Sequence, residues 1–88
     1  MKIPERYIED LNKIIEEKDR YNTVQLFYAY TKLWALKDVF KNYGMTSEDE
    51  EFDRLLTVLV EIEMKIAIRL HINEEMEKWR GKNYEGKS

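Results

Sequence analysis

The feature that most constrains the fold of this 88-residue chain is a run of alternating apolar residues from Val58 to Ile72. Every second position in the run is Val, Ile, Met or Leu, a period that is typical of a half-buried β-strand. A strand of fifteen residues would be unusually long, and no glycine or proline bounds this one. The only plausible partner strand, residues 24–31, is about half as long.

The spacing of charged residues decides between strand and helix. Acidic residues repeatedly stand four positions before basic ones, which is the favourable order on the surface of a helix. The sequence therefore predicts a helix through the alternating run. The pairs are Glu9 with Lys13, Glu16 with Arg20, Glu50 with Arg54, Glu61 with Lys65 and Glu74 with Lys78.

Two other helices are predicted before this one. The first covers about residues 4–21, because Pro4 suits an opening turn and apolar residues then recur at intervals of three and four. The second covers about residues 24–43, with Asn22 or Thr23 as its N-cap and Gly44 at its C-terminal end. It carries most of the aromatic residues, so we expect it to lie centrally or to contact two neighbours.

The third helix is predicted over about residues 47–80, since Ser47 and Glu50 have the spacing of a capping box. Its length would be about 50 Å, against about 30 Å for the second helix, so about a third of it would overhang. Alternatively, Asn73 caps a short fourth helix that folds back over the bundle. The tail at residues 81–88 has two glycines and no periodicity, and we expect it to be mobile.

These elements predict a single all-α domain over residues 1–88, an antiparallel bundle of three helices, or four if the last one breaks. A chain of this length has room for one core, and the absence of cysteine excludes disulfides and thiolate metal sites. The N-terminus lacks the apolar segment of a secretory signal, and charges interrupt residues 55–72. We therefore expect a cytoplasmic protein that does not contact a membrane.

The overhang predicts a surface that binds protein. An exposed apolar patch of this size usually marks an interaction site, and Tyr, Trp and Met are enriched at protein interfaces. The candidate partner-binding residues are Leu70, Ile72, Met76 and Trp79, with Tyr28 and Tyr30 on the second helix.

Charge is distributed unevenly along the chain, with about −7 over residues 45–77 and about +3 over residues 78–88. The acidic residues have two interpretations: a solvated helix start stabilised by the helix dipole, or a surface that imitates nucleic-acid phosphates on a basic target. They are Glu48, Asp49, Glu50, Glu51 and Asp53. The basic end, residues 78–84, resembles a single-strand binder only locally, and for an acidic domain we expect no direct nucleic-acid binding.

Catalytic chemistry is poorly supplied by this composition. There is no cysteine, only one histidine and no glycine-rich phosphate loop, so we expect no enzymatic activity and no cofactor. His71, Glu75 and Glu63 could approach one edge of a helix, which keeps a metal-binding or small-molecule-binding bundle as an alternative.

The leading prediction is a helical bundle that docks on a protein, as an inhibitor, an immunity protein or an adaptor, or that self-associates. An acidic nucleic-acid mimic that inhibits a nucleic-acid-handling protein is the other alternative.

Overall fold

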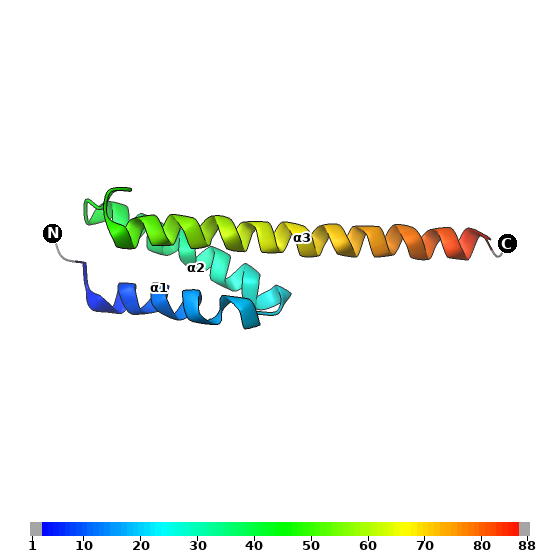
Figure 1. Ribbon diagram of the computed structural model, residues 1–88, viewed down its shortest axis with the longest axis horizontal. Coiled ribbons are helices and arrows are strands. Elements are labelled where there is room, and N and C mark those ends of the chain that lie inside the picture. The colour runs from blue at the N-terminus through cyan, green and yellow to red at the C-terminus, as the bar shows by residue number, and fades with distance from the viewer. Residues whose placement is uncertain (1–2, 87–88) are drawn as a thin grey trace.

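A computed structural model describes the backbone of residues 3–86 and the side chains of residues 3–79. In that part of the chain the elements are α1 (Glu5–Glu17), a short 3-10 helix η1 (Lys18–Arg20), α2 (Thr23–Asn42) and α3 (Glu50–Gly86), and there is no strand. α1 and α3 run in one direction and α2 in the other (Figure 1). The predicted all-α fold with a long C-terminal helix is confirmed.

The bounds of the helices differ from the prediction at several ends. α1 stops at Glu17, and η1 replaces its last predicted turn. α3 passes Asn73 without a break and continues to Gly86, so there is no fourth helix in the described part of the chain. Residues 81–86, predicted as a tail, are helical, and residues 87–88 lie outside the described part.

Two of the predicted helix ends are present with their expected chemistry. The Asn22 side chain accepts a hydrogen bond from the Gln25 backbone N–H at 2.8 Å, and the Gln25 side chain accepts one from the Asn22 N–H at 2.8 Å. This reciprocal pair fixes the start of α2. Beyond α2, Gly44 has a φ of 80°, a left-handed conformation that a glycine adopts without steric strain.

The predicted capping box at the start of α3 is wrong. The helix begins at Glu50, three residues after Ser47, so Ser47 does not cap it. The preceding turn is closed instead by Asp49, whose side chain accepts a hydrogen bond from the Thr46 N–H at 2.8 Å. The Thr46 hydroxyl accepts a longer bond from the Glu48 N–H at 3.3 Å.

The core forms where α2 lies between the inner faces of α1 and α3. Five α2 residues are buried, more than the two that α1 contributes. The aromatic rings of Phe40 on α2 and Phe52 on α3 lie 6.1 Å apart, which joins the far end of α2 to the start of α3. The buried residues are Leu11, Ile14, Leu26, Ala29, Leu33, Leu36, Phe40, Phe52, Leu55, Val58, Leu59, Ile62 and Ile66.

The molecule is elongated because α3 outruns the other helices (Figure 1). Its extents are 66 × 20 × 16 Å, and its radius of gyration is 17.9 Å. A compact domain of this length has a radius of gyration of about 12 Å. In the described residues, no helix has both the length and the apolarity to cross a membrane.

Replacing Gly44 tests the strain at the end of α2. No atom lies within 4 Å of the position that a Cβ would occupy, so Gly44→Ala meets no clash and its cost comes from the backbone conformation alone. We expect a loss of about 1–2 kcal/mol in the free energy of unfolding, measured with urea. Gly44→Asn is the control and should lose less, since Asn tolerates this conformation better; equal losses would contradict the explanation.

Candidate protein-binding surface on the third helix

The alternating run in α3 forms two apolar rows that wind around one helix about 160° apart. Successive residues of a helix are about 100° apart, so residues two positions apart point about 160° away from each other. Positions four apart are offset by about 40°, so each row of such positions winds slowly around the helix. The run therefore separates into an inner row, Val58, Ile62, Ile66 and Leu70, and an outer row, Val60, Met64, Ile68, Ile72 and Met76.

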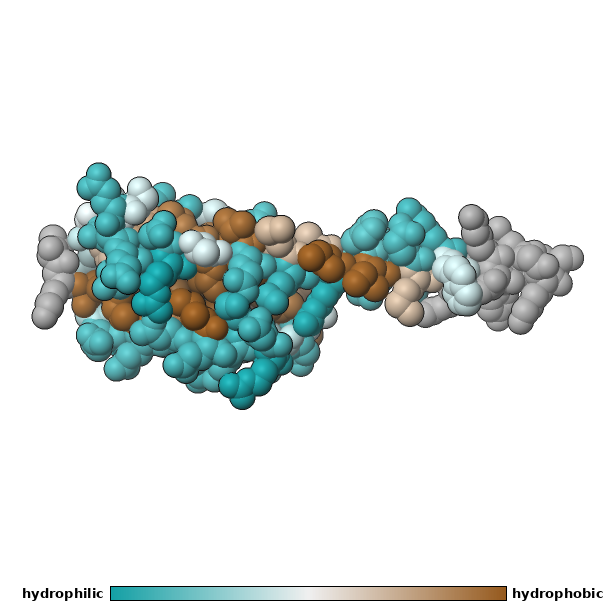
Figure 2. Space-filling model, in the orientation of Figure 1, coloured by the Kyte–Doolittle hydropathy of each residue, from teal (hydrophilic) through white to brown (hydrophobic). Residues whose placement is uncertain are grey.

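Burial distinguishes the two rows sharply. The inner row packs in the core as far as Ile66, with Ile62 completely buried, whereas Leu70 is 45% exposed. The outer row is uncovered along its full length, with exposed fractions between 50 and 59%. Figure 2 shows hydrophobic surface along α3 that continues past the end of the bundle. A soluble domain seldom exposes so long a row of large apolar side chains without a partner.

The structure groups three of the four predicted overhang residues. Ile72, Met76 and Trp79 are spaced by four and three positions, so they share a face, and Trp79 is 68% exposed. Leu70 does not join them, because it continues the inner row beyond the last buried residue, Ile66. The four residues therefore belong to two faces of α3.

The sequence prediction missed the first half of the outer row, Val60, Met64 and Ile68. Their signal was the alternation itself, which places a second apolar row opposite the first once the run is helical. The prediction used the alternation only to choose between a strand and a helix, and not to find a second exposed row.

The two predicted tyrosines of α2 have different surroundings. Tyr28 is 70% exposed and lies with the exposed residues Val24 and Phe27 on the side of α2 that faces away from the core. Tyr30 is half-buried, packs on the core and meets the Trp34 ring edge-on at 6.2 Å. Only Tyr28 is therefore available to a partner in the way that the prediction required.

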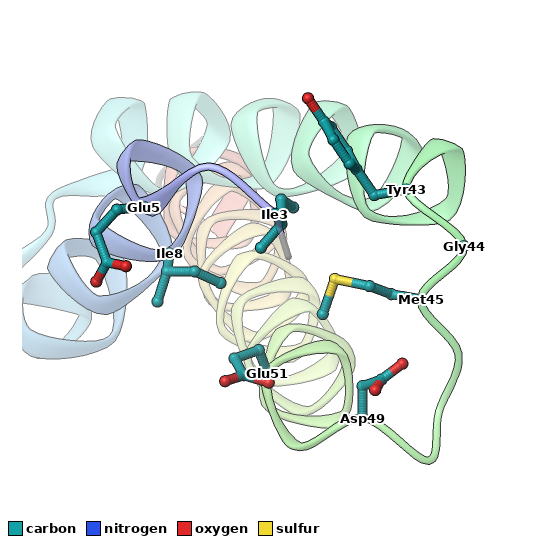
Figure 3. Close-up of a pocket in the computed structure, with 8 residues that line it drawn as sticks. All are labelled: Ile3, Glu5, Ile8, Tyr43, Gly44, Met45, Asp49 and Glu51. Carbon is teal, nitrogen blue, oxygen red and sulfur yellow. The ribbon is translucent and has the colours of Figure 1, made fainter. Parts of the chain in front are cut away.

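The acidic block, residues 48–53, lies at the opposite end of the bundle from the overhang (Figure 1). Two of its carboxylates line a pocket of about 350 Å³ between the start of α1 and the turn after α2 (Figure 3). The pocket is lined by Ile3, Glu5, Ile8, Tyr43, Gly44, Met45, Asp49 and Glu51. Because Asp49 already closes the turn before α3, the helix-start interpretation accounts for part of this charge.

The metal-site alternative finds no support in the described residues. His71, Glu63 and Glu75 are exposed. No three His, Cys, Asp or Glu side chains of residues 3–79 are placed to hold a metal ion. At the basic end, Lys78 is exposed and pairs with Glu75 at 3.9 Å, and the side chains of the following basic residues lie outside the described part.

Arg69 marks the point where α3 leaves the bundle. Its guanidinium donates one hydrogen bond to the Tyr21 carbonyl at 2.9 Å and another to the Thr23 hydroxyl at 3.3 Å. These bonds join α3 to the turn between η1 and α2. From Leu70 to Trp79 every side chain is exposed, and we call residues 70–86 the arm.

An ion-pair cluster joins α3 to η1 just before Arg69. Lys18 lies 2.5 Å from Glu61 and 3.6 Å from Asp19, and Lys65 lies 3.3 Å from Asp19. Glu61 and Lys65, predicted to pair with each other, thus bind residues of the neighbouring element. The hydrogen bond to Lys65 and the charge of Lys18 lower the pKa of Asp19, and the bond to Glu61 raises the pKa of Lys18.

Comparison with protein-family models, with curated proteins and with solved structures finds no match to this chain.

The Arg69 contacts can be tested by substitution. Arg69→Ala removes two charge-assisted bonds and leaves the Tyr21 carbonyl without this donor, so we expect the free energy of unfolding to fall by about 1.5–3 kcal/mol. Amide exchange should rise most at the start of α2. Lys78→Ala, which changes an exposed pair of the arm, is the control and should alter stability by less than about 0.5 kcal/mol.

The ion-pair cluster predicts a pH dependence of known sign. The pKa of Asp19 is lowered from 3.8 by folding, so its contribution is present above that pH and is lost as the pH falls through the folded-state value. Asp19→Asn should therefore lose less stability than the wild type between neutral and strongly acidic pH, as measured by urea unfolding. Because Asp19 is exposed, we expect a small effect, and parallel pH profiles would contradict this assignment.

Proposed function

We propose that this chain is a non-enzymatic binding protein that contacts another protein, or a second copy of itself, through the outer row of α3. The observation that carries the proposal is the exposure of all five outer-row residues on a helix whose inner row is buried in the core as far as Ile66. Nothing in the packing of the monomer requires large apolar residues at these positions. Burial of such a row on a partner is the usual reason for its presence.

The shape of the molecule supports the same proposal. The arm extends about 25 Å past Arg69, and each of its described side chains is exposed. An apolar face on a preformed helix binds a partner with little loss of backbone entropy, because the backbone is already ordered. Inhibitors and adaptors act in this way, by occupying a surface of the target.

Substitution of the arm tests the proposal. Met76→Ala combined with Trp79→Ala removes two exposed side chains, so we expect the free energy of unfolding to change by at most about 0.5 kcal/mol. Tagged wild-type protein should retain a specific protein from extract of its native cells, either another polypeptide or untagged copies of this chain. The double variant should lose it.

Val24→Ala provides the matched control, because Val24 is an exposed apolar residue on a different helix. It should retain the same bound protein as the wild type. If the arm variant retains its partner, the proposed surface is wrong. If the arm variant unfolds several kcal/mol more easily, these residues serve the core and the proposal also fails.

A further inference from the structure

The outer row of α3 has one side that faces the bundle and one side that is open. Each residue of a helix has its sequence neighbours about 100° to either side, so a row residue has one flanking position before it and one after it. The positions after the first three row residues are Glu61, Lys65 and Arg69, and all three bond to η1 or to the turn that follows it. A partner that covers the row is therefore bounded by η1 on this side and approaches from the other.

The open side of the row carries exposed carboxylates. The positions before the four later row residues are Glu63, Ala67, His71 and Glu75, and all four side chains are exposed. Glu74 adds another exposed carboxylate next to Glu75. A partner that packs on the row from its open side therefore meets negative charge in two places, near the start of the row and past its centre.

The cations of α3 do not neutralise this side of the row. Within residues 50–79, all of them except Lys78 bond to α1, η1 or the turn after η1. Lys78 meets Glu75 at 3.9 Å with its side chain 74% exposed, and such an exposed pair is weak. In the sequence Arg80 and Lys82 follow, and both stand beyond Met76, the last residue of the row. Along the row itself, the open side is therefore acidic.

This charge selects the chemistry of the partner. A second copy paired antiparallel through the same row would place its own carboxylates beside these, which is unfavourable. Lysine or arginine side chains would instead meet charges of opposite sign. From this charge complementarity we propose that the partner of the outer row is a basic amphipathic helix, whose apolar face covers the row and whose cations lie beside Glu63 and Glu75. The inference rests on the proposed function and names the partner of that surface.

The winding of the row sets the length of the contact. Met64, Ile68 and Ile72 span about 80° of the helix surface, an arc that one straight helix can cover by packing against this ridge of residues four apart. Glu63 and Glu75 lie at the two ends of this segment, twelve residues or about 18 Å apart along α3. The partner helix therefore needs cations about three turns apart on one side of its apolar face.

Two designed helical peptides test the charge of the partner. Both carry leucine at four-residue spacing, and the flanking positions are lysine in one peptide and glutamate in the other. Fluorescence anisotropy with the purified chain should show that the lysine peptide binds about tenfold more tightly or better at low salt, and that the difference shrinks at about 0.5 M sodium chloride. Equal affinities of the two peptides would overturn the proposal.

Charge reversal locates the site on the chain. Glu63→Lys combined with Glu75→Lys should weaken binding of the lysine peptide by about tenfold or more and strengthen binding of the glutamate peptide. Glu48→Lys combined with Glu50→Lys is the matched control, since it changes the net charge equally at the other end of the bundle (Figure 1). This control should leave the affinity within about twofold. Loss of binding in the control alone would place the peptide on the acidic block, and the proposal would be wrong.

The apolar part of the contact needs a separate substitution. Ile68 is 56% exposed, so Ile68→Gln should leave the thermal melt of the protein nearly unchanged. It should weaken binding of the lysine peptide by about tenfold, because it removes the apolar centre of the row. If the affinity does not change, the peptide binds elsewhere and the outer row is not its site.

These outcomes separate the inference from the proposed function. If ultracentrifugation shows a dimer that Ile68→Gln dissociates and that the lysine peptide does not displace, the partner is a second copy and the basic helix is overturned. If the two peptides bind equally but the chain still loses a captured protein on substitution of Met76 and Trp79, the proposed function stands with a partner of different chemistry.

Discussion

The packing of the inner row of α3 against α2 is the interaction on which the rest of the structure depends. A chain of 88 residues without disulfides has one small core, and α2 and α3 supply most of it. α1 adds only two buried residues and is held to α3 by polar contacts as well, including the hydrogen bond from Arg54 to Asn12. The side of α3 that faces α2 therefore sets which side is left for solvent or for a partner.

The type of fold was predictable because the signals for it are local. Charge spacing identified α3 as helical, and Asn22 and Gly44 act where their chemistry suggested. The ends that were missed depend on more distant contacts or on competition between neighbours. Thr46, Ser47 and Asp49 can all cap a helix, and sequence alone does not say which of them will close the turn.

The candidate surface was predictable in kind and less so in its residues. Exposure of Ile72, Met76 and Trp79 follows from the length of α3, which was one of the two alternatives that the sequence left open at Asn73. Leu70 was wrongly grouped with them, because the side of α3 that faces α2 is determined by packing and cannot be read from the sequence. Tyr28 and Tyr30 show the same difficulty, since two residues on one helix differ in burial according to where the neighbouring helix lies.

Because α3 is continuous, a single helix contains two segments of different stability. Up to Arg69 its backbone is protected by the core, so opening there requires unfolding of the bundle. Past that point the hydrogen bonds of the arm face water, and a helical segment of this length is only marginally stable without tertiary support. The part of α3 that lies within the bundle stays helical and nucleates the arm. The arm can therefore fray from its free end and reform without a new nucleation step. A ligand that binds the arm would therefore stabilise its helix, so that the arm and the bundle would unfold as one cooperative unit.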